Sequence, residues 1–183
     1  MNSLSQDPNA PSPWVLRFAP LVVAGARVLD VACGTGRHSR LFASRGCNVE
    51  AVDRDAAALA SLQGVAGIRI RKCDLESGDW PYATAEFDAI VVANYLFRPL
   101  FHPMLASLNA SGVLIYETFM VGNEQLGRPS NPDFLLRPGE LLKLADLGLE
   151  VVAFEQGYAE QPRPAMLQRI AAVRPGFRGA RPI

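Results

Sequence analysis

Two carboxylates and a pair of glycines stand at a spacing that could hold a nucleoside. Asp30 lies near the end of the segment 27–32, and Asp53 follows one predicted helix and one predicted strand later. Between them, Gly34 and Gly36 let the main chain approach a ligand that any Cβ would push away. A carboxylate placed like Asp53 can accept hydrogen bonds from both hydroxyls of a ribose. The pattern therefore predicts a nucleoside site beside this turn.

The turn departs from the pattern of a nicotinamide dinucleotide site. Such a site needs three glycines spaced G-x-G-x-x-G, with a pyrophosphate at the start of the helix that follows. Here Ser39 occupies the third position, and Asp30 would add negative charge near the phosphates. A ligand without phosphate and with a cationic centre fits these residues better.

The elements that must position these residues are a strand, a helix and a second strand. Residues 27–32 contain a short apolar run typical of a buried parallel strand. Helical spacing runs from His38 to Phe42 and ends at Gly46, and residues 48–52 predict the next strand. In open parallel sheets, ligands bind at the carboxyl ends of the strands, which is where the glycine turn lies.

The sequence D-V-A-C-G-T-G-R, which starts at Asp30, resembles the first motif of class I S-adenosylmethionine (SAM)-dependent methyltransferases, usually D-x-G-x-G-x-G. Gly34 and Gly36 match the motif, Ala32 replaces its first glycine, and Asp53 matches the family's ribose-binding acid. The C-terminal half resembles the small bacterial members named after tellurite resistance. The resemblance implies an α/β fold, a Rossmann-like seven-stranded, mostly parallel sheet with helices on both faces and an antiparallel last strand.

The resemblance also implies further cofactor contacts. Asp74, just beyond a predicted third strand at 68–72, would accept the exocyclic amine of adenine, and Leu75 would offer its main-chain N–H to the ring; a plain turn residue is the alternative for Asp74. We expect no metal, because the chain has only two histidines and its three cysteines lack C-x-x-C spacing. The residues expected to bind SAM are Asp30, Ala32, Cys33, Gly34, Gly36, Arg37, Asp53, Arg54, Asp74, Leu75 and Asn94.

Residues for the methyl acceptor are expected after a predicted fourth strand at 89–93. The N-P-P-Y sequence that methyltransferases acting on base amino groups often carry there is absent, and so is the Pro-Cys pair of cytosine-C5 enzymes. Arg98 or Arg128 could hold an anionic acceptor, as could Arg37. Tyr95 and Glu117 could orient or deprotonate a protic one. Each of these side chains is also common as a surface or structural residue.

The expected reaction depends on alignment more than on side-chain chemistry. A sulfonium-bound methyl group is already activated, so the protein must mainly align the reactants and exclude water. A general base is needed only where the acceptor carries a proton, so a soft or anionic nucleophile needs none. We therefore predict an enzyme that transfers a methyl group from SAM to a small-molecule acceptor. Methylation of RNA or protein, and SAM binding without turnover, are the alternatives.

Two further segments are expected near the site. Residues 119–136 show no clear period, and such a long loop in a compact domain is usually functional; we expect it to overhang the pocket as a lid. A short helix at 14–19 is expected either to lie across the cofactor pocket or only to cap the core. Pro138 and Gly148 bound a predicted helix, and the last two strands are expected to form an antiparallel pair.

Length and composition predict a single methyltransferase domain at 14–173, between flexible tails at 1–13 and 174–183. Eighteen basic residues balance 18 acidic ones, which weighs against a nucleic-acid partner recognised through charge. The odd cysteine count favours reduced thiols and a cytoplasmic location. No apolar segment is long enough to cross a bilayer, so no membrane partner is expected. The sequence leaves the oligomeric state open.

Overall fold

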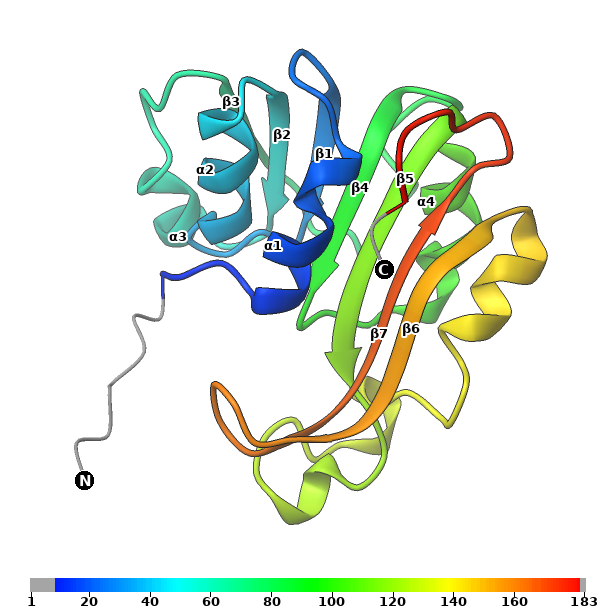
Figure 1. The fold of residues 1–183 in the computed structure, drawn as a ribbon. Coiled ribbons are helices and arrows are strands. Elements are labelled where there is room, and N and C mark those ends of the chain that lie inside the picture. Colours follow the sequence, from blue (N-terminus) through cyan, green and yellow to red (C-terminus); the bar gives the residue numbers. More distant parts are fainter. Residues whose placement is uncertain (1–8, 182–183) are drawn as a thin grey trace, which may run out of the picture.

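The computed structural model describes residues 9–181, which form a seven-stranded sheet with helices on both faces (Figure 1). The strand order is β3-β2-β1-β4-β5-β7-β6. Neighbouring strands are parallel from β3 to β5, whereas β7 is antiparallel to both β5 and β6. This confirms the predicted sheet. The strands are β1 (Arg27–Val31), β2 (Asn48–Asp53), β3 (Ile68–Lys72), β4 (Phe87–Ala93), β5 (Leu108–Phe119), β6 (Glu150–Ala159) and β7 (Ala165–Val173).

Alternate side chains of the central strands build two separate cores. Leu29 and Ile90 face the core that α4 and the 3-10 helix η5 cover, whereas Val28 and Val91 face α1 and α2. Both faces of β1 and β4 are buried, which explains why their sequences are apolar without alternation. The α-helices are α1 (Pro13–Phe18), α2 (Arg37–Ser44), α3 (Ala56–Ala60) and α4 (Phe101–Ala106), and the 3-10 helices are η1 (Ala19–Leu21), η2 (Arg98–Leu100), η3 (Asn123–Gln125), η4 (Pro132–Phe134) and η5 (Leu142–Leu147).

Helix α1 begins earlier than predicted. The Ser12 hydroxyl accepts a hydrogen bond from the main chain of Trp14 at 3.1 Å, and Pro13 is the first helical residue. The expectation of a flexible tail through residue 13 is therefore wrong for Ser12 and Pro13. Residues 1–8 of that tail lie outside the described residues.

The C-terminal residues 174–177 are packed against the domain rather than flexible. The Arg174 guanidinium donates to the carbonyl oxygens of Leu147, Gly148 and Leu105, so it satisfies carbonyls at the ends of η5 and α4. Phe177 packs against the core on the α1 side of the sheet. The prediction of a flexible tail from residue 174 is wrong here, because its first arginine is a capping residue.

The end of the chain differs from the sequence prediction in two further ways. The expected helix between Pro138 and Gly148 is the shorter 3-10 helix η5, which still ends at Gly148 with a φ of +86°. Strands β6 and β7 are longer than predicted, and their hairpin extends beyond the ends of the parallel strands (Figure 1). Within residues 9–181, no helix is long and apolar enough to span a membrane.

Candidate active site

The glycine turn after β1 is fixed to the end of β2 by Asp53. One carboxylate oxygen, Oδ2, accepts a hydrogen bond from the Gly34 main chain at 2.8 Å, and Oδ1 accepts one from Asp55 at 2.9 Å. Each oxygen can accept a second hydrogen bond. The carboxylate is thus held in place with acceptor capacity left for a pair of ligand hydroxyls.

The two glycines of the turn have different surroundings. A Cβ at Gly36 would lie 2.5 Å from the Leu62 side chain, so this glycine allows α2 and the α3 region to pack closely. A Cβ at Gly34 would meet nothing within 4 Å. Both residues have positive φ, +56° at Gly34 and +79° at Gly36, which favours glycine at each. Gly34 therefore leaves open space beside Asp53, as a bound nucleoside requires.

Asp30 is buried beneath the turn with half of its carboxyl group unsatisfied. Its Oδ2 accepts a hydrogen bond from the Ser39 hydroxyl at 2.6 Å, whereas its Oδ1 has no hydrogen-bond partner within the described part of the chain. Burial raises the pKa of Asp30 to about 6, against the lowering effect of Ser39. A buried carboxylate oxygen without a partner is costly, so a cationic ligand group at this place would stabilise it.

Cys33, inside the same turn, is half-buried and donates weakly to the Gly34 carbonyl at 3.6 Å. Burial raises the pKa of the Cys33 thiol, and the charges of Asp30 and Asp53 raise it further. The thiol is therefore protonated and unreactive at neutral pH.

A cavity of about 180 Å³ lies over the carboxyl ends of β1, β2 and β3. The Asp74 carboxylate at its rim accepts a hydrogen bond from the Glu76 main chain at 3.0 Å. Tyr95, expected on the acceptor side, also lines this cavity, and burial raises the pKa of its hydroxyl. The sequence analysis did not name Glu76 as a site residue. Its only signal in the sequence is its position two residues after Asp74. The lining residues are Ala32, Asp53, Arg54, Cys73, Asp74, Leu75, Glu76 and Tyr95.

A second cavity, of about 370 Å³, lies on the other side of the residue pair Asn94-Tyr95. Asn94 has a φ of +58°, and its main-chain N–H donates to the Glu117 carbonyl at 3.0 Å, which ties the end of β4 to β5. Arg37, expected beside the cofactor, lines this cavity as well. The lining residues are Ala10, Pro11, Ser12, Pro13, Arg37, Asn94, Glu117, Phe119, Pro162, Arg163, Ala165, Leu167 and Arg169.

Sequence reasoning missed two walls of the second cavity. The β6–β7 hairpin contributes Pro162, Arg163, Ala165, Leu167 and Arg169, in a region that the sequence marked only as a connector and the start of a strand. The segment 10–13 supplies the other wall, where the Ser12 main chain donates to Nε2 of His38 at 3.1 Å. Burial, aided by the charge of Arg37, lowers the pKa of His38 to about 3, so its imidazole is neutral and can accept this bond.

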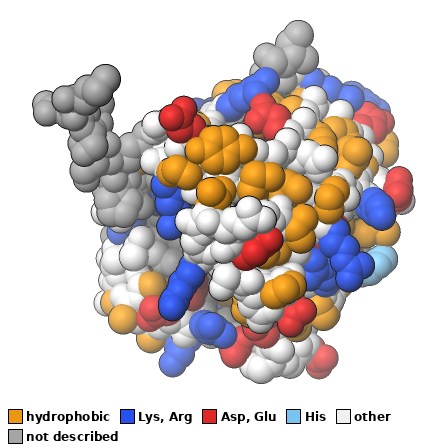
Figure 2. All heavy atoms as spheres, turned by 90° about the horizontal axis from the view of Figure 1, so that it is seen from below, with side chains coloured by type: hydrophobic (Ala, Val, Ile, Leu, Met, Phe, Trp, Pro, Cys, Tyr) orange, Lys and Arg blue, Asp and Glu red, His pale blue; other side chains and the backbone are white. Residues whose placement is uncertain are grey.

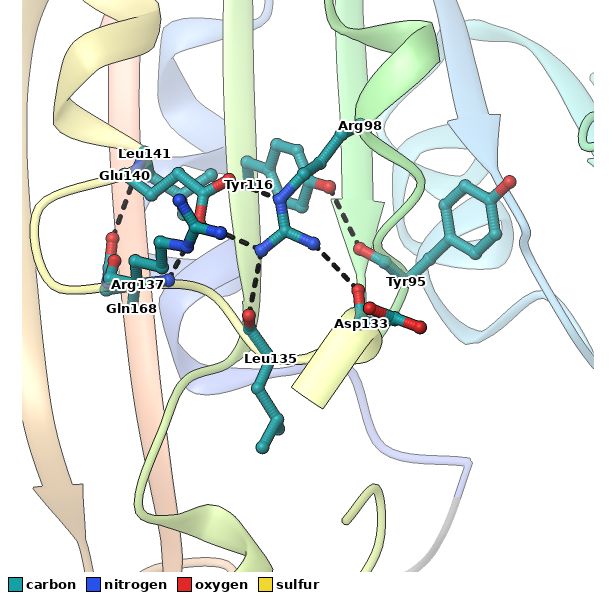
Figure 3. Close-up of polar contacts among 9 residues, drawn as sticks. All are labelled: Tyr95, Arg98, Tyr116, Asp133, Leu135, Arg137, Glu140, Leu141 and Gln168. Atoms are coloured by element: carbon teal, nitrogen blue, oxygen red, sulfur yellow. Dashed lines mark hydrogen bonds and ion pairs between the residues drawn. The ribbon is translucent and has the colours of Figure 1, made fainter. Parts of the chain in front are cut away.

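Arg98 lies in a network of protein contacts and lines neither cavity (Figure 3). Its Nε is 2.6 Å from Oε1 of Glu140, and its other nitrogens donate to the carbonyl oxygens of Asp133 at 2.8 Å and Leu135 at 2.9 Å. The hydrogen bond to Glu140 raises the pKa of Arg98. The guanidinium therefore joins the segment after β4 to the segment before η5.

The predicted lid is anchored at both ends rather than free. The Leu136 main chain donates to the Phe119 carbonyl at 2.9 Å, and Val121 donates back to Leu136 at 3.0 Å. Of residues 119–136, only Phe119 lines the second cavity. Arg128 is exposed and lines neither cavity. In the described residues, no group of three or more metal-binding side chains is found.

The surface around the site carries charges of both signs. Figure 2 views the molecule from below Figure 1, toward the edge at which β4 and β5 end. Lys and Arg side chains are interspersed with Asp and Glu on this face, and hydrophobic side chains gather in one area. The described residues on this face form no continuous basic tract.

Comparison with known proteins places this geometry among methyltransferases. Residues 28–110 match a family model described as a methyltransferase domain. The ribosomal RNA small subunit methyltransferase H of Gemmatimonas aurantiaca is 31% identical over 147 residues, which are 78% of this chain and 44% of that protein. The chain thus spans less than half the length of this curated relative.

Solved structures share the fold at low sequence identity. TehB from Haemophilus influenzae superposes with a TM-score of 0.76 at 18% identity, over 90% of this chain and 62% of that one. A 1,6-didemethyltoxoflavin-N1-methyltransferase from Burkholderia thailandensis, solved with S-adenosylhomocysteine, gives a TM-score of 0.67 at 18% identity, over 93% of this chain and 80% of that one. These likenesses confirm the class I fold.

Proposed function

We propose that this chain is a SAM-dependent methyltransferase that transfers the methyl group to a small-molecule acceptor. The observation that carries the proposal is the pair of cavities on either side of Asn94-Tyr95. The larger one, of about 370 Å³, has the size of pockets that take small ligands. The acceptor and the nucleoside would then meet at the end of β4.

On the cofactor side, three carboxylates would divide the binding between them. Asp53, held by the Gly34 main chain, would accept the ribose hydroxyls. Asp74 would accept the adenine amine, and Leu75 would donate its main-chain N–H. Asp30 would use its unsatisfied oxygen for the ammonium group. When bound, SAM supplies a methyl group that needs no further activation.

On the acceptor side, the chain would align the nucleophile and exclude water. Phe119 and Leu167 give the cavity apolar walls, which lower the local dielectric around the reacting atoms. Glu117 lines the cavity and accepts a hydrogen bond from Arg169 at 3.2 Å. Its carboxylate would orient a protic acceptor or receive the proton that such an acceptor releases.

An RNA acceptor is the second candidate, because the curated relative is a ribosomal RNA methyltransferase. Binding to RNA relies on a basic surface that contacts phosphates. The balanced composition and the mixed charges around the site give less support to RNA than to a small molecule (Figure 2).

Methyl-labelled SAM distinguishes these acceptors. The purified chain is incubated with a cell extract separated into small molecules, RNA and protein, and the label in each fraction is measured. The expected result is label in a small molecule that chromatography separates from SAM and its breakdown products, and loss of that labelled product in the Asp53→Ala variant. Label confined to RNA or protein would overturn the choice of acceptor. A chain that binds SAM but labels no fraction would instead be a binding module.

A further inference from the structure

We propose that the larger cavity selects an organic anion, a molecule with an apolar body and one anionic group, of which a carboxylate is the simplest. This deepens the proposed function and rests on it for the reaction that follows, but the binding can be measured without turnover.

The cavity contains more positive than negative charge. Three arginines and one acid line it. Arg169 is engaged by Glu117 at 3.2 Å and by Glu155 at 3.5 Å, so its charge is compensated. Arg37 and Arg163 form no ion pair within residues 9–181. Two cations are therefore available to an anionic ligand.

These two arginines come from separate elements and are held only loosely. Arg37 begins α2, directly after the glycine turn, and within residues 9–181 its guanidinium donates one hydrogen bond, of 3.5 Å, to the Ala10 carbonyl. Arg163 lies in the β6–β7 hairpin, with its guanidinium 5.6 Å from the centre of the Phe119 ring. Either guanidinium can give its remaining donors to a bound anion, because the only acid in the described lining, Glu117, is already paired with Arg169 and does not compete for them.

The rest of the lining is mainly apolar, which indicates the body of the ligand. Pro11, Pro13, Phe119, Ala165 and Leu167 all contribute to it. An inorganic oxyanion would leave this surface in contact with water, whereas an organic body would cover it and gain from its burial. The combination therefore favours an organic anion over an inorganic one.

The test compares carboxylates with amides of the same shape. Benzoate with benzamide, 3-phenylpropanoate with its amide, and hexanoate with hexanamide are titrated into the full chain saturated with S-adenosylhomocysteine, and inorganic phosphate is titrated separately. Calorimetry gives the affinities. We expect at least one carboxylate to bind about 10-fold tighter than its amide, as one charge-assisted hydrogen bond implies, and phosphate to bind more weakly than that carboxylate.

Single-arginine variants locate the effect. Arg163→Gln and Arg37→Gln should each weaken the preferred carboxylate about 10-fold and its amide hardly at all. Arg45→Gln is the matched control, because Arg45 is exposed and lines neither cavity. Its affinity for the carboxylate should stay within about 2-fold of the wild-type value. Circular dichroism checks that each variant is folded.

Any of three results would overturn the proposal of an organic anion. The amides could bind as tightly as every carboxylate, phosphate could bind more tightly than all the carboxylates, or the Arg37 and Arg163 variants could bind the carboxylate as Arg45→Gln does. Failure of the proposed function gives a different result, since a wild-type chain that does not bind S-adenosylhomocysteine lacks the cofactor site itself. The two failures are read from separate titrations of the same protein.

Discussion

The Nε atom of Arg98 lies 2.6 Å from Oε1 of Glu140, and this ion pair holds the segment after β4 against the segment before η5 (Figure 3). Nearby, the Tyr116 hydroxyl donates to the Tyr95 carbonyl at 2.9 Å. Tyr95 in turn lines the smaller cavity. The sequence analysis proposed Arg98 as a residue that contacts the acceptor. Its contacts instead make it a structural residue that connects two segments of the chain behind the site.

Arg98→Gln removes charged hydrogen bonds and is expected to lower the free energy of unfolding. The loss should be only about 1–2 kcal/mol, because these hydrogen bonds are partly exposed. Glu140→Gln should cost less, since Arg98 keeps its bonds to the Asp133 and Leu135 carbonyls. Urea denaturation measures both changes. A larger loss of stability in Glu140→Gln than in Arg98→Gln would contradict this structural role of Arg98.

Asp30→Asn should stabilise the ligand-free chain and weaken cofactor binding. The pKa of Asp30 is raised from 3.8 to about 6 by burial, so the folded chain binds more protons than the unfolded chain between these pH values. Its contribution to stability is therefore complete below pH 3.8 and is lost as the pH rises through 6. At pH 8 the free energy of unfolding of Asp30→Asn should exceed that of the wild-type chain by roughly 3 kcal/mol, as measured by urea denaturation.

The same carboxyl group predicts how cofactor affinity depends on pH. An ammonium group binds ionised Asp30 and not the neutral acid, so the wild-type affinity for S-adenosylhomocysteine should fall as the pH drops through about 6. In Asp30→Asn the affinity should be about 10-fold weaker and should lose this dependence. An unchanged pH profile in the variant would remove Asp30 from the ammonium site.

Asp53→Ala should weaken S-adenosylhomocysteine by about 10-fold or more, because the ribose hydroxyls and the Gly34 main chain lose their acceptor together. Asp79→Ala removes an equal charge from an exposed position that lines neither cavity, and serves as the control. Calorimetry compares the two. Equal affinities in the two variants would exclude Asp53 as a cofactor residue.

The two glycines of the turn should separate stability from binding. Gly36→Ala places a Cβ 2.5 Å from Leu62 and should destabilise the chain by about 1–3 kcal/mol. In Gly34→Ala the new Cβ meets no atom within 4 Å, so the stability should fall only by the strain of the positive φ, about 1 kcal/mol. The same variant should weaken cofactor binding. Thermal denaturation and calorimetry test this; equal losses of stability would contradict it.

The sequence was sufficient to predict the fold and the resemblance to methyltransferases. Buried parallel strands are continuous apolar runs, and the turn at Gly34 with the acids Asp30 and Asp53 is local in sequence. Each of these signals depends on neighbours within one βαβ unit, so no tertiary contact was needed to find them.

The acceptor side could not be predicted in the same way. Arg98 and Arg128 were chosen for their charge, but whether an arginine faces a cavity depends on partners such as Glu140, 42 positions away. Arg163 comes from a hairpin whose extension beyond the sheet has no signature in its own sequence. The capping role of Arg174 depends likewise on carbonyls of distant helices.

The most direct test of the account is calorimetric titration of the wild-type chain with S-adenosylhomocysteine and with NAD. We predict one molecule of S-adenosylhomocysteine per chain, an affinity that depends on Asp53, and no measurable heat with NAD. Binding of NAD in preference to S-adenosylhomocysteine would contradict the assignment of the crevice between Asp30 and Asp53.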